Sequence, residues 1–190
     1  MKKNKAYVFR HGKTFYNEKG IFTGWKDSKL TPRGIGNAKE VAKKLKNKNI
    51  DVAIHTTLSR SKDTLKYVLK FHPECKKILV DDRMIERSYG SLAGKKHDTI
   101  IEEYGIEKYN LWHRGFNVRP PKGESFADVE KRVKKFILWL KKYVKDNKVD
   151  VAISAHGNSI RLFRKIMENL SVKETESLNI PYDKVYVYKI

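Results

Sequence analysis

Short apolar runs alternate with longer amphipathic stretches along this chain, and that alternation limits the folds open to it more than any other feature. Five runs have the length and composition of strands: 6–9, 51–55, 77–82, 150–155 and 184–190. Strands that alternate with helices predict an α/β fold, here a three-layer sandwich with a mainly parallel central sheet. The length of 190 residues suits a single domain spanning 1–190.

The amphipathic stretches have helical periodicity. Four helices are predicted, over 31–48, 58–71, 125–146 and 158–170. Thr31 has the side chain of an N-cap, and the proline that follows it suits the first helical position. Ser125, with Asp128 three residues later, resembles a capping box. One apolar stripe runs along the third of these helices: Val129, Val133, Phe136, Ile137, Leu140 and Val144.

The segment from about 93 to 123 is less periodic than the rest of the chain and contains the turn-like "RPPKGES". Long irregular segments in compact domains are often lids or binding loops. We therefore expect a lid-like insertion at about 93–123, covering one edge of the sheet.

The composition excludes several classes of protein. A single cysteine, Cys75, cannot form an internal disulfide framework. No stretch approaches the roughly 20 apolar residues of a membrane span, and the first residues lack the apolar run of a signal peptide. We expect a cytoplasmic protein without membrane contact. The sequence leaves the oligomeric state open, a homo-oligomer included.

The formal net charge is +20, from 42 basic and 22 acidic side chains, and such a charge attracts anions. Only 10 of the 42 basic residues are arginine, and the lysines are scattered over helix faces. We interpret most of this charge as solvated helix surface. Nucleic-acid binding is the less favoured alternative, because the chain has neither zinc-finger spacing nor an aromatic RNA-binding signature.

Polar residues follow three of the predicted strands. Arg10 and His11 end the first strand, Arg60 comes shortly after the second, and His156 follows the fourth. Ligands of open α/β sheets bind at the carboxyl ends of strands, so we expect these side chains to meet at one rim. Each of them alone has an ordinary structural explanation, as a polar strand end or a helix cap. Their combination at successive strand ends favours a functional site.

Two histidines and two arginines at one rim indicate phosphoryl chemistry. Arginine matches phosphate oxygens in pairs, and a neutral imidazole is a competent nucleophile. A second imidazole, if protonated, would stabilise charge on the transferring group. Transfer to an alcohol or water also needs a proton shuttle. Glu86, which follows the third strand, could reach the rim and serve as general acid and then base, although a lone glutamate is more often a surface carboxylate.

Four motifs occur in the order found in the histidine phosphatase superfamily: "FRHGKTFYN", "TTLSRSKDT", "ERSYGSLAG" and "SAHGNSIR". The chain most resembles the cofactor-dependent phosphoglycerate mutases of that superfamily. The segments "FTGWKDSKLTPRG", "GESFADV" and "SLNIPYDKVYVYKI" are also similar to the mutases. The resemblance covers nearly the whole sequence.

The resemblance implies a role for each motif residue. His11 would be the phosphorylated nucleophile, and Glu86 the proton donor and acceptor. Arg10, Arg60 and His156 would complete the phosphate pocket. The implied substrate contacts are Thr14, Asn17, Thr23, Gly24, Tyr89, Lys96, His97, His113, Arg114, Gly157 and Asn158. The implied reaction interconverts 2- and 3-phosphoglycerate, in glycolysis and gluconeogenesis, through phosphohistidine. It is primed by 2,3-bisphosphoglycerate and requires no metal.

The sequence departs from the mutase pattern at several positions. Lys13 stands where an acidic or amide residue is common, and His113 replaces the first of two adjacent arginines. His97 stands where the mutases have a lysine that binds the substrate, and the neighbouring Lys95 or Lys96 could take over that role. The segment 114–123 is short, and no tail follows Ile190. Since a lid and a tail help to exclude water, these departures favour hydrolysis over transfer.

Three hypotheses follow from the sequence. The leading one is a phosphoglycerate mutase, and the alternative is a phosphomonoesterase that hydrolyses small phosphate esters at the same site. The third is a basic nucleic-acid-binding module with a vestigial site. It is disfavoured because a decayed site is expected to lose some of its catalytic residues, and here all of them are present. In the first two, the partner is a small phosphorylated substrate.

Overall fold

A five-stranded sheet forms the centre of the computed structural model, which describes residues 4–190. The strands are β1 (Lys5–Arg10), β2 (Val52–His55), β3 (Lys77–Val80), β4 (Val151–Ala155) and β5 (Val185–Lys189). Their order is β3-β2-β4-β1-β5, and β5 alone runs antiparallel to its neighbour. The prediction of an α/β fold with a mainly parallel sheet is confirmed.

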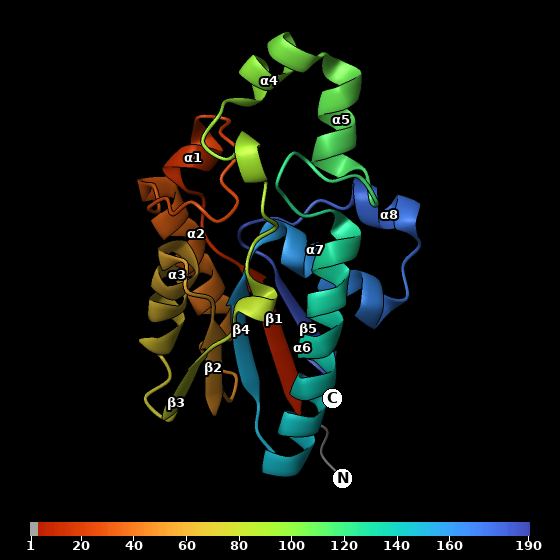
Figure 1. Ribbon diagram of the computed structural model, residues 1–190. Helices are drawn as coiled ribbons and strands as arrows, with labels where there is room; N and C mark the ends of the chain where they lie inside the picture. Colours follow the sequence, from red (N-terminus) through yellow and green to blue (C-terminus); the bar gives the residue numbers. More distant parts are fainter. Residues whose placement is uncertain (1–3) are drawn as a thin grey trace.

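Helices cover both faces of the sheet and make it the middle layer of three (Figure 1). Helices α2 (Pro32–Leu45) and α3 (Ser59–Leu69) pack against one face, where they bury Tyr7 and Phe9 of β1. Helices α6 (Phe126–Asn147) and α7 (Gly157–Glu168) pack against the other face, over Ala6 and Val8. Successive β1 side chains point to opposite faces of the sheet, so this one strand contributes to both cores.

The main helices begin where the sequence predicts. The Thr31 hydroxyl accepts a hydrogen bond from the backbone of Gly34, and Ser125 and Asp128 form a capping box at the start of α6. The predicted apolar stripe of α6 is buried along its whole length. Each fully buried Leu, Ile or Val of this stripe contributes about 1.5–3 kcal/mol, so α6 anchors one layer of the sandwich.

The segment 93–123 contains two helices rather than the irregular chain that we expected. They are α4 (His97–Tyr104) and α5 (Ile106–Arg114), which meet at Gly105, where φ is +82°. Each helix is too short to give a clear periodic pattern. Together they lie beyond the carboxyl edge of the sheet, over a small separate apolar cluster (Figure 1). That cluster consists of Phe22, Tyr89, Leu92, Ile100 and Trp112.

Shorter helices complete the chain: α1 (Phe15–Glu18), η1 (Asp82–Met84), η2 (Gly90–Leu92) and α8 (Val172–Ser177). The strand predicted over 77–82 ends at Val80, two residues early. The reason is local, because the Asp81 side chain accepts a hydrogen bond from the backbone of Arg83 and caps η1. This change of direction carries the chain from the third strand toward the rim.

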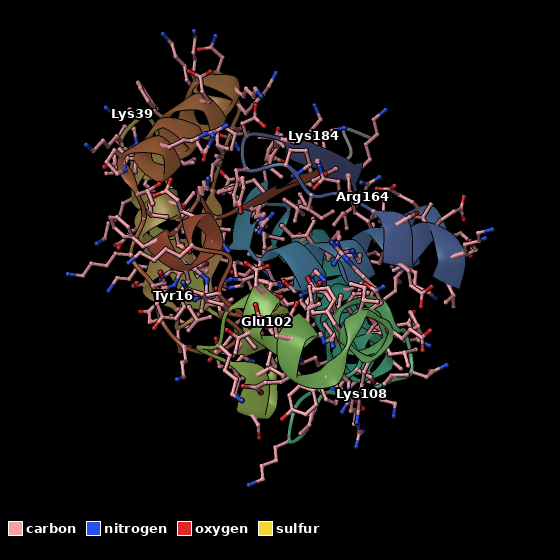
Figure 2. All side chains as sticks on the ribbon, turned by 90° about the horizontal axis from the view of Figure 1, so that it is seen from above. Tyr16, Lys39, Glu102, Lys108, Arg164 and Lys184 are labelled. Carbon is pink, nitrogen blue, oxygen red and sulfur yellow. The ribbon has the colours of Figure 1, made fainter. Side chains whose placement is uncertain are left out.

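Basic side chains project on several sides of the molecule. In Figure 2, Lys39 on α2, Lys108 on α5 and Lys184 beside β5 point outward in different directions. Within residues 4–190, no helix has both the length and the apolar character needed to cross a membrane.

The chain leaving β1 crosses the first turn of α2 in backbone contact. A Cβ atom on Gly34 would lie 1.9 Å from the carbonyl oxygen of Lys13, and one on Gly12 would lie 2.1 Å from that of Gly34. The backbone N–H of Thr31 also donates to the Lys13 carbonyl, at 2.9 Å. Two glycines therefore permit the crossing that holds the residues after His11 against the sheet.

We predict that Gly34→Ala lowers the free energy of unfolding by about 1–3 kcal/mol, because the added methyl collides with backbone that cannot rotate away. Gly36→Ala, two residues along the same helix, is the matched control, since a Cβ there meets no atom within 4 Å. It should be neutral or stabilising by up to about 1 kcal/mol. Urea denaturation measures both, and equal stabilities of the two variants would contradict the prediction.

Candidate active site

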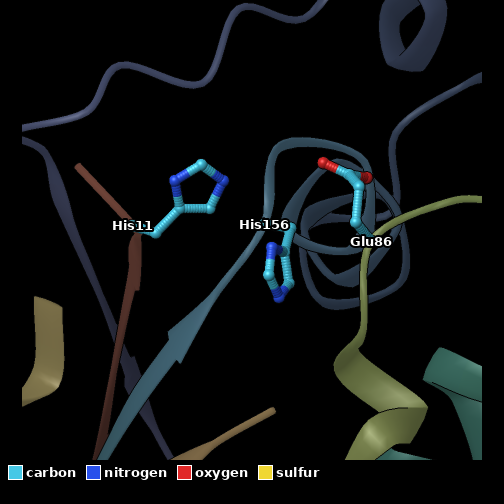
Figure 3. Close-up of side chains that lie close together, drawn as sticks. All are labelled: His11, Glu86 and His156. Atoms are coloured by element: carbon cyan, nitrogen blue, oxygen red, sulfur yellow. The ribbon is translucent and has the colours of Figure 1, made fainter. Parts of the chain in front are cut away.

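The ends of β1 and β4 bring two histidines together at the carboxyl edge of the sheet. Arg10 pairs with Ala155 in the β1–β4 ladder, so His11 and His156 follow at adjacent strand ends. Their ring centroids lie 5.1 Å apart. Glu86, from the chain after η1, completes the group, and Figure 3 shows its carboxylate beside the two rings. The nitrogen and oxygen atoms that the three side chains offer lie within 4.8 Å of one another.

The tautomer and charge of His11 are those that a nucleophilic histidine needs. Its Nδ1 lies 2.7 Å from the carbonyl oxygen of Gly12. A carbonyl only accepts, so Nδ1 carries the proton and Nε2 carries the lone pair. Burial, and after it the charges of Arg60 and Arg10, hold the pKa of His11 well below its ordinary value. The ring is therefore neutral at pH 7 and has a free nucleophilic nitrogen.

His156 is completely buried and its pKa is also held well below the ordinary value, first by burial and then by Arg60. Its Nε2 lies 2.7 Å from the hydroxyl oxygen of Thr56, which follows β2. Its Nδ1 has no hydrogen-bond partner among the described residues. When the Thr56 hydroxyl donates to Nε2, the proton of the neutral ring lies on Nδ1 and is available to an oxygen of a bound anion.

Two arginines beside the histidines keep donors free for an anion. Arg60 donates to the carbonyls of Gly24 and Lys26 through its two terminal nitrogens, at 2.7 and 2.9 Å. Arg10 donates through Nη1 to the carbonyl of Ile180, at 2.9 Å. The Nε atoms of both arginines are buried and have no partner within residues 4–190. Unpaired buried donors are costly, so this pair is suited to a phosphate.

Glu86 is oriented by the backbone. Its Oε1 accepts hydrogen bonds from the amides of Arg87 and Asn158, at 2.7 and 3.2 Å. Arg132 on α6 donates to the carbonyls of Ile85 and Glu86, at 2.8 and 3.1 Å, and so fixes the backbone on either side of the carboxylate. One oxygen is thus held in place, and the carboxyl group can exchange a proton through the other.

Two further arginines and a group of rings line the outer end of the pocket. Arg161 on α7 is 5 % exposed, and its pKa is lowered to about 9, first by burial and then by Arg114. His97 and His113 lie beside each other, with ring centroids 5.3 Å apart. Burial lowers the pKa of His113 to about 3 and that of His97 less strongly. Both rings are neutral at pH 7, so the arginines supply the charge here.

The pocket has a volume of about 200 Å³, smaller than the roughly 300–1,000 Å³ typical of drug-sized ligands. Most of the residues predicted from the sequence line it: Arg10, His11, Asn17, Thr23, Gly24, Arg60, Glu86, Tyr89, His97, His113, Arg114, Gly157 and Asn158. His156 lies beneath its floor, against His11.

Thr14 and Lys96 are not among the residues that line the pocket. Thr14 is buried as the N-cap of α1, with its hydroxyl bonded to Asn17. Lys96 precedes α4 and forms a backbone bridge with Ile21. The structure therefore gives both residues local structural roles and assigns the outer wall to His97.

Six lining residues were not predicted: Ile21, Phe22, Arg161, Asn179, Ile180 and Tyr182. Arg161 had a usable signal, because it lies four residues after Gly157 on the same helix face. The residues from 179 to 182 lie in the mutase-like segment "SLNIPYDKVYVYKI", but nothing in the sequence shows that the loop before β5 carries them to the pocket.

His11, Glu86 and His156 could together offer three ligand atoms to a metal ion. Their surroundings disfavour a cation, because the positive charges of Arg10 and Arg60 lie close to both histidines. The same charges favour an anion.

A family model described as "Histidine phosphatase superfamily (branch 1)" matches residues 6–190. The chain belongs to this superfamily. Curated relatives support the assignment. A protein of Parvibaculum lavamentivorans is 33 % identical over 98 % of this chain and 90 % of its own length, and one of Rhizobium rhizogenes is 36 % identical over 96 % and 88 %. Both are named 2,3-bisphosphoglycerate-dependent phosphoglycerate mutase.

Solved structures agree with the superfamily assignment. Bacillus stearothermophilus YhfR superposes with a TM-score of 0.84 at 25 % identity, over 97 % of this chain and 90 % of that one. A mycobacterial glucosyl-3-phosphoglycerate phosphatase superposes with a TM-score of 0.80 at 23 % identity, over 94 % and 85 %, and shows that the fold is shared. As a histidine phosphatase superfamily enzyme, this protein acts on a phosphate ester.

The neutral histidines of the site predict a dependence of stability on pH. Folding holds the pKa values of His11, His113 and His156 below their ordinary value of about 6.5. The unfolded chain therefore binds more protons below pH 6.5, and the free energy of unfolding falls as the pH falls. We predict a loss of about 1.4 kcal/mol for each of these histidines between pH 7.5 and 5.5.

Urea denaturation at the two pH values measures this loss. His113→Asn removes one of these groups and should reduce the loss by about 1.4 kcal/mol. A protein that is equally stable or more stable at pH 5.5 would show that these rings are protonated in the folded state.

Proposed function

We propose that this enzyme interconverts 2- and 3-phosphoglycerate through a phosphohistidine on His11, primed by 2,3-bisphosphoglycerate. The observation that carries the proposal is the charge of the pocket. Four arginines line it, at positions 10, 60, 114 and 161, against the single carboxylate of Glu86. Phosphoglycerate carries a phosphate and a carboxylate, together about three negative charges, which balances this excess.

The charges are arranged at two ends of the pocket. Arg10 and Arg60 lie beside the histidines and suit the phosphate that is transferred. Arg114 and Arg161 lie near each other at the outer end, where they suit a second anionic group. Arg114 is half-buried and Arg161 is buried, and Arg161 donates to neutral oxygens of Leu178 and Asn158. A substrate with only one phosphate would leave both positive charges without an anion beside them. A substrate with both a phosphate and a carboxylate places one anionic group at each end of the pocket.

Different residues of this chain carry out the bond formation, the proton exchange and the charge stabilisation of the transfer. Nε2 of His11 forms the bond to phosphorus as the bond from phosphorus to the donor oxygen breaks. Glu86 gives a proton to that oxygen, and takes it back from the acceptor hydroxyl in the reverse transfer. Arg10, Arg60 and His156 stabilise charge on the three phosphoryl oxygens. Bound 2,3-bisphosphoglycerate supplies the phosphoryl group that primes His11, and its two phosphates and carboxylate match the two cationic ends.

All of these residues come from one chain, so the proposed site does not depend on a homo-oligomer. The curated mutases, at 33 and 36 % identity over nearly the whole length, support the same substrate and primer. We extend the proposal to a cytoplasmic enzyme on the same grounds.

A specific observation also favours phosphomonoesterase activity. His97 and His113 are neutral at pH 7, because burial lowers both pKa values. The sequence resemblance leads one to expect a lysine and an arginine at these places. The outer end therefore holds a second phosphate less firmly than two further cations would, and an acceptor that is held weakly competes poorly with water.

Phosphorus NMR of products from 3-phosphoglycerate tests the proposal. We predict that 2-phosphoglycerate forms, that added 2,3-bisphosphoglycerate accelerates its formation, and that His11→Ala abolishes it. Thr175→Ser, a substitution at a buried hydroxyl of α8 outside the pocket, is the control for general damage. Accumulation of inorganic phosphate without 2-phosphoglycerate would refute the mutase and support the phosphomonoesterase.

We predict that Arg114→Ala raises KM for 3-phosphoglycerate about 10- to 100-fold, because a hydrogen bond to a charged group contributes roughly 1.5–3 kcal/mol. Hydrolysis of glycerol 3-phosphate, which lacks the carboxylate, should change by less than about twofold. Lys108→Ala removes an exposed cation from the same helix and is the matched control. Equal effects of Arg114→Ala on both substrates would show that Arg114 does not recognise the carboxylate.

A further inference from the structure

The loop between α8 and β5 forms one side of the active-site pocket, and cations fix its backbone at three carbonyls. We call residues 178–183 the strap. Arg161 donates to the carbonyl of Leu178 at 2.7 Å, Arg10 to that of Ile180, and Lys44 to that of Asp183 at 2.6 Å. Two of these three anchors, Arg161 and Arg10, also line the pocket. The strap is therefore fixed in position relative to the phosphate-binding residues.

Tyr182 is the aromatic residue of the strap. The centre of the Arg10 guanidinium lies 4.0 Å from the centroid of its ring, which is the geometry of a cation–π contact. The ring centroid lies 6.4 Å from that of His11. The Tyr182 ring thus lies against Arg10 and beside His11. Its hydroxyl group takes part in neither of these contacts.

A second cavity, of about 370 Å³, lies on the other side of this residue. The two cavities share four lining residues, Arg10, Asn179, Ile180 and Tyr182. The rest of the second cavity is lined mainly by polar residues: Lys13, Arg33, Asn37, Pro181 and Asp183. A polar space of this size admits several water molecules. The four shared residues form the wall between this space and the pocket, and Tyr182 contributes its aromatic ring, which lies against Arg10.

We propose that Tyr182 determines how the phosphohistidine is divided between transfer and hydrolysis, because its ring closes the active-site pocket toward the second cavity. This inference rests on the phosphohistidine of the proposed function and concerns its fate once formed. In hydrolysis, a water oxygen forms a bond to phosphorus while the bond from phosphorus to Nε2 breaks. The proton of the water passes to Glu86, and inorganic phosphate leaves. In transfer, an acceptor hydroxyl takes the place of water.

Tyr182 is a positioning residue in this scheme, and the ring rather than the hydroxyl does the work. Tyr182→Ala joins the two cavities and gives water a second path to the phosphorus. Tyr182→Phe keeps the wall and the contact with Arg10. The two variants therefore separate the effect of the ring from that of the hydroxyl.

The test uses p-nitrophenyl phosphate as donor and 3-phosphoglycerate as acceptor. The products are counted in the initial phase, before 2,3-bisphosphoglycerate returns its phosphoryl group to His11. In that phase, nitrophenolate counts the phosphohistidine formed, inorganic phosphate counts hydrolysis, and 2,3-bisphosphoglycerate together with 2-phosphoglycerate counts transfer. We expect Tyr182→Ala to raise the ratio of hydrolysis to transfer about tenfold, which is a change of about 1.4 kcal/mol between the two barriers. Tyr182→Phe should keep the ratio within about twofold of the parent enzyme.

An unchanged ratio in Tyr182→Ala would overturn the inference, as would an equal change in Tyr182→Phe. A variant that is merely damaged forms less phosphohistidine but keeps the ratio. If the parent forms phosphohistidine and neither bisphosphate nor 2-phosphoglycerate, the mutase proposal fails. The inference is then decided by the decay of radiolabelled phosphohistidine in a single turnover, which must be about tenfold faster in Tyr182→Ala.

Discussion

Hydrogen bonds from buried arginines to loop carbonyls hold this site together. Arg60 fixes the loop after α1 at Gly24 and Lys26, and Arg132 fixes the backbone around Glu86. Arg87, which is fully buried, donates to the carbonyls of Trp112, His113 and Glu124 and so secures the end of α5. These loops come from distant parts of the sequence, and a small apolar cluster that includes Phe22, Tyr89 and Trp112 also joins them. The hydrogen bonds from each arginine therefore add to a limited apolar packing.

The same arrangement opposes folding. Burial and mutual repulsion lower the pKa of Arg60 to about 10 and that of Arg161 to about 9, and they keep His11 and His156 neutral. These shifts mean that each charge is less stable in the folded pocket than in water. The two apolar layers of the sandwich offset this cost. An anion in the pocket reverses the balance locally, because it gives the unpaired Nε atoms of Arg10 and Arg60 a partner.

The sequence predicted the parts of the structure that follow from short-range rules. Strand and helix periodicity predicted the sheet and the main helices, and the rule for strand ends predicted that Arg10, His11 and His156 meet. The helices α4 and α5 were missed, because each spans about two turns and Gly105 separates them. Arg161 was missed although it lies four residues after Gly157 on α7. Tyr182 was missed because its position depends on where the strap runs, and hydrogen bonds from side chains to carbonyls far apart in the sequence determine that path.

The difference between features set by short-range rules and features set by long-range contacts bears directly on function. The phosphohistidine that we propose on His11 would be common to a mutase and a phosphatase, so the predicted catalytic residues do not distinguish them. The distinction arises afterwards, when an acceptor hydroxyl and water compete for the same phosphorus. In the proposed function, Arg114 and Arg161 would determine how firmly the acceptor is held, and Tyr182 how easily water arrives. The outcome of the reaction would then depend on α5 and the strap, whose positions come from long-range contacts rather than from the motifs.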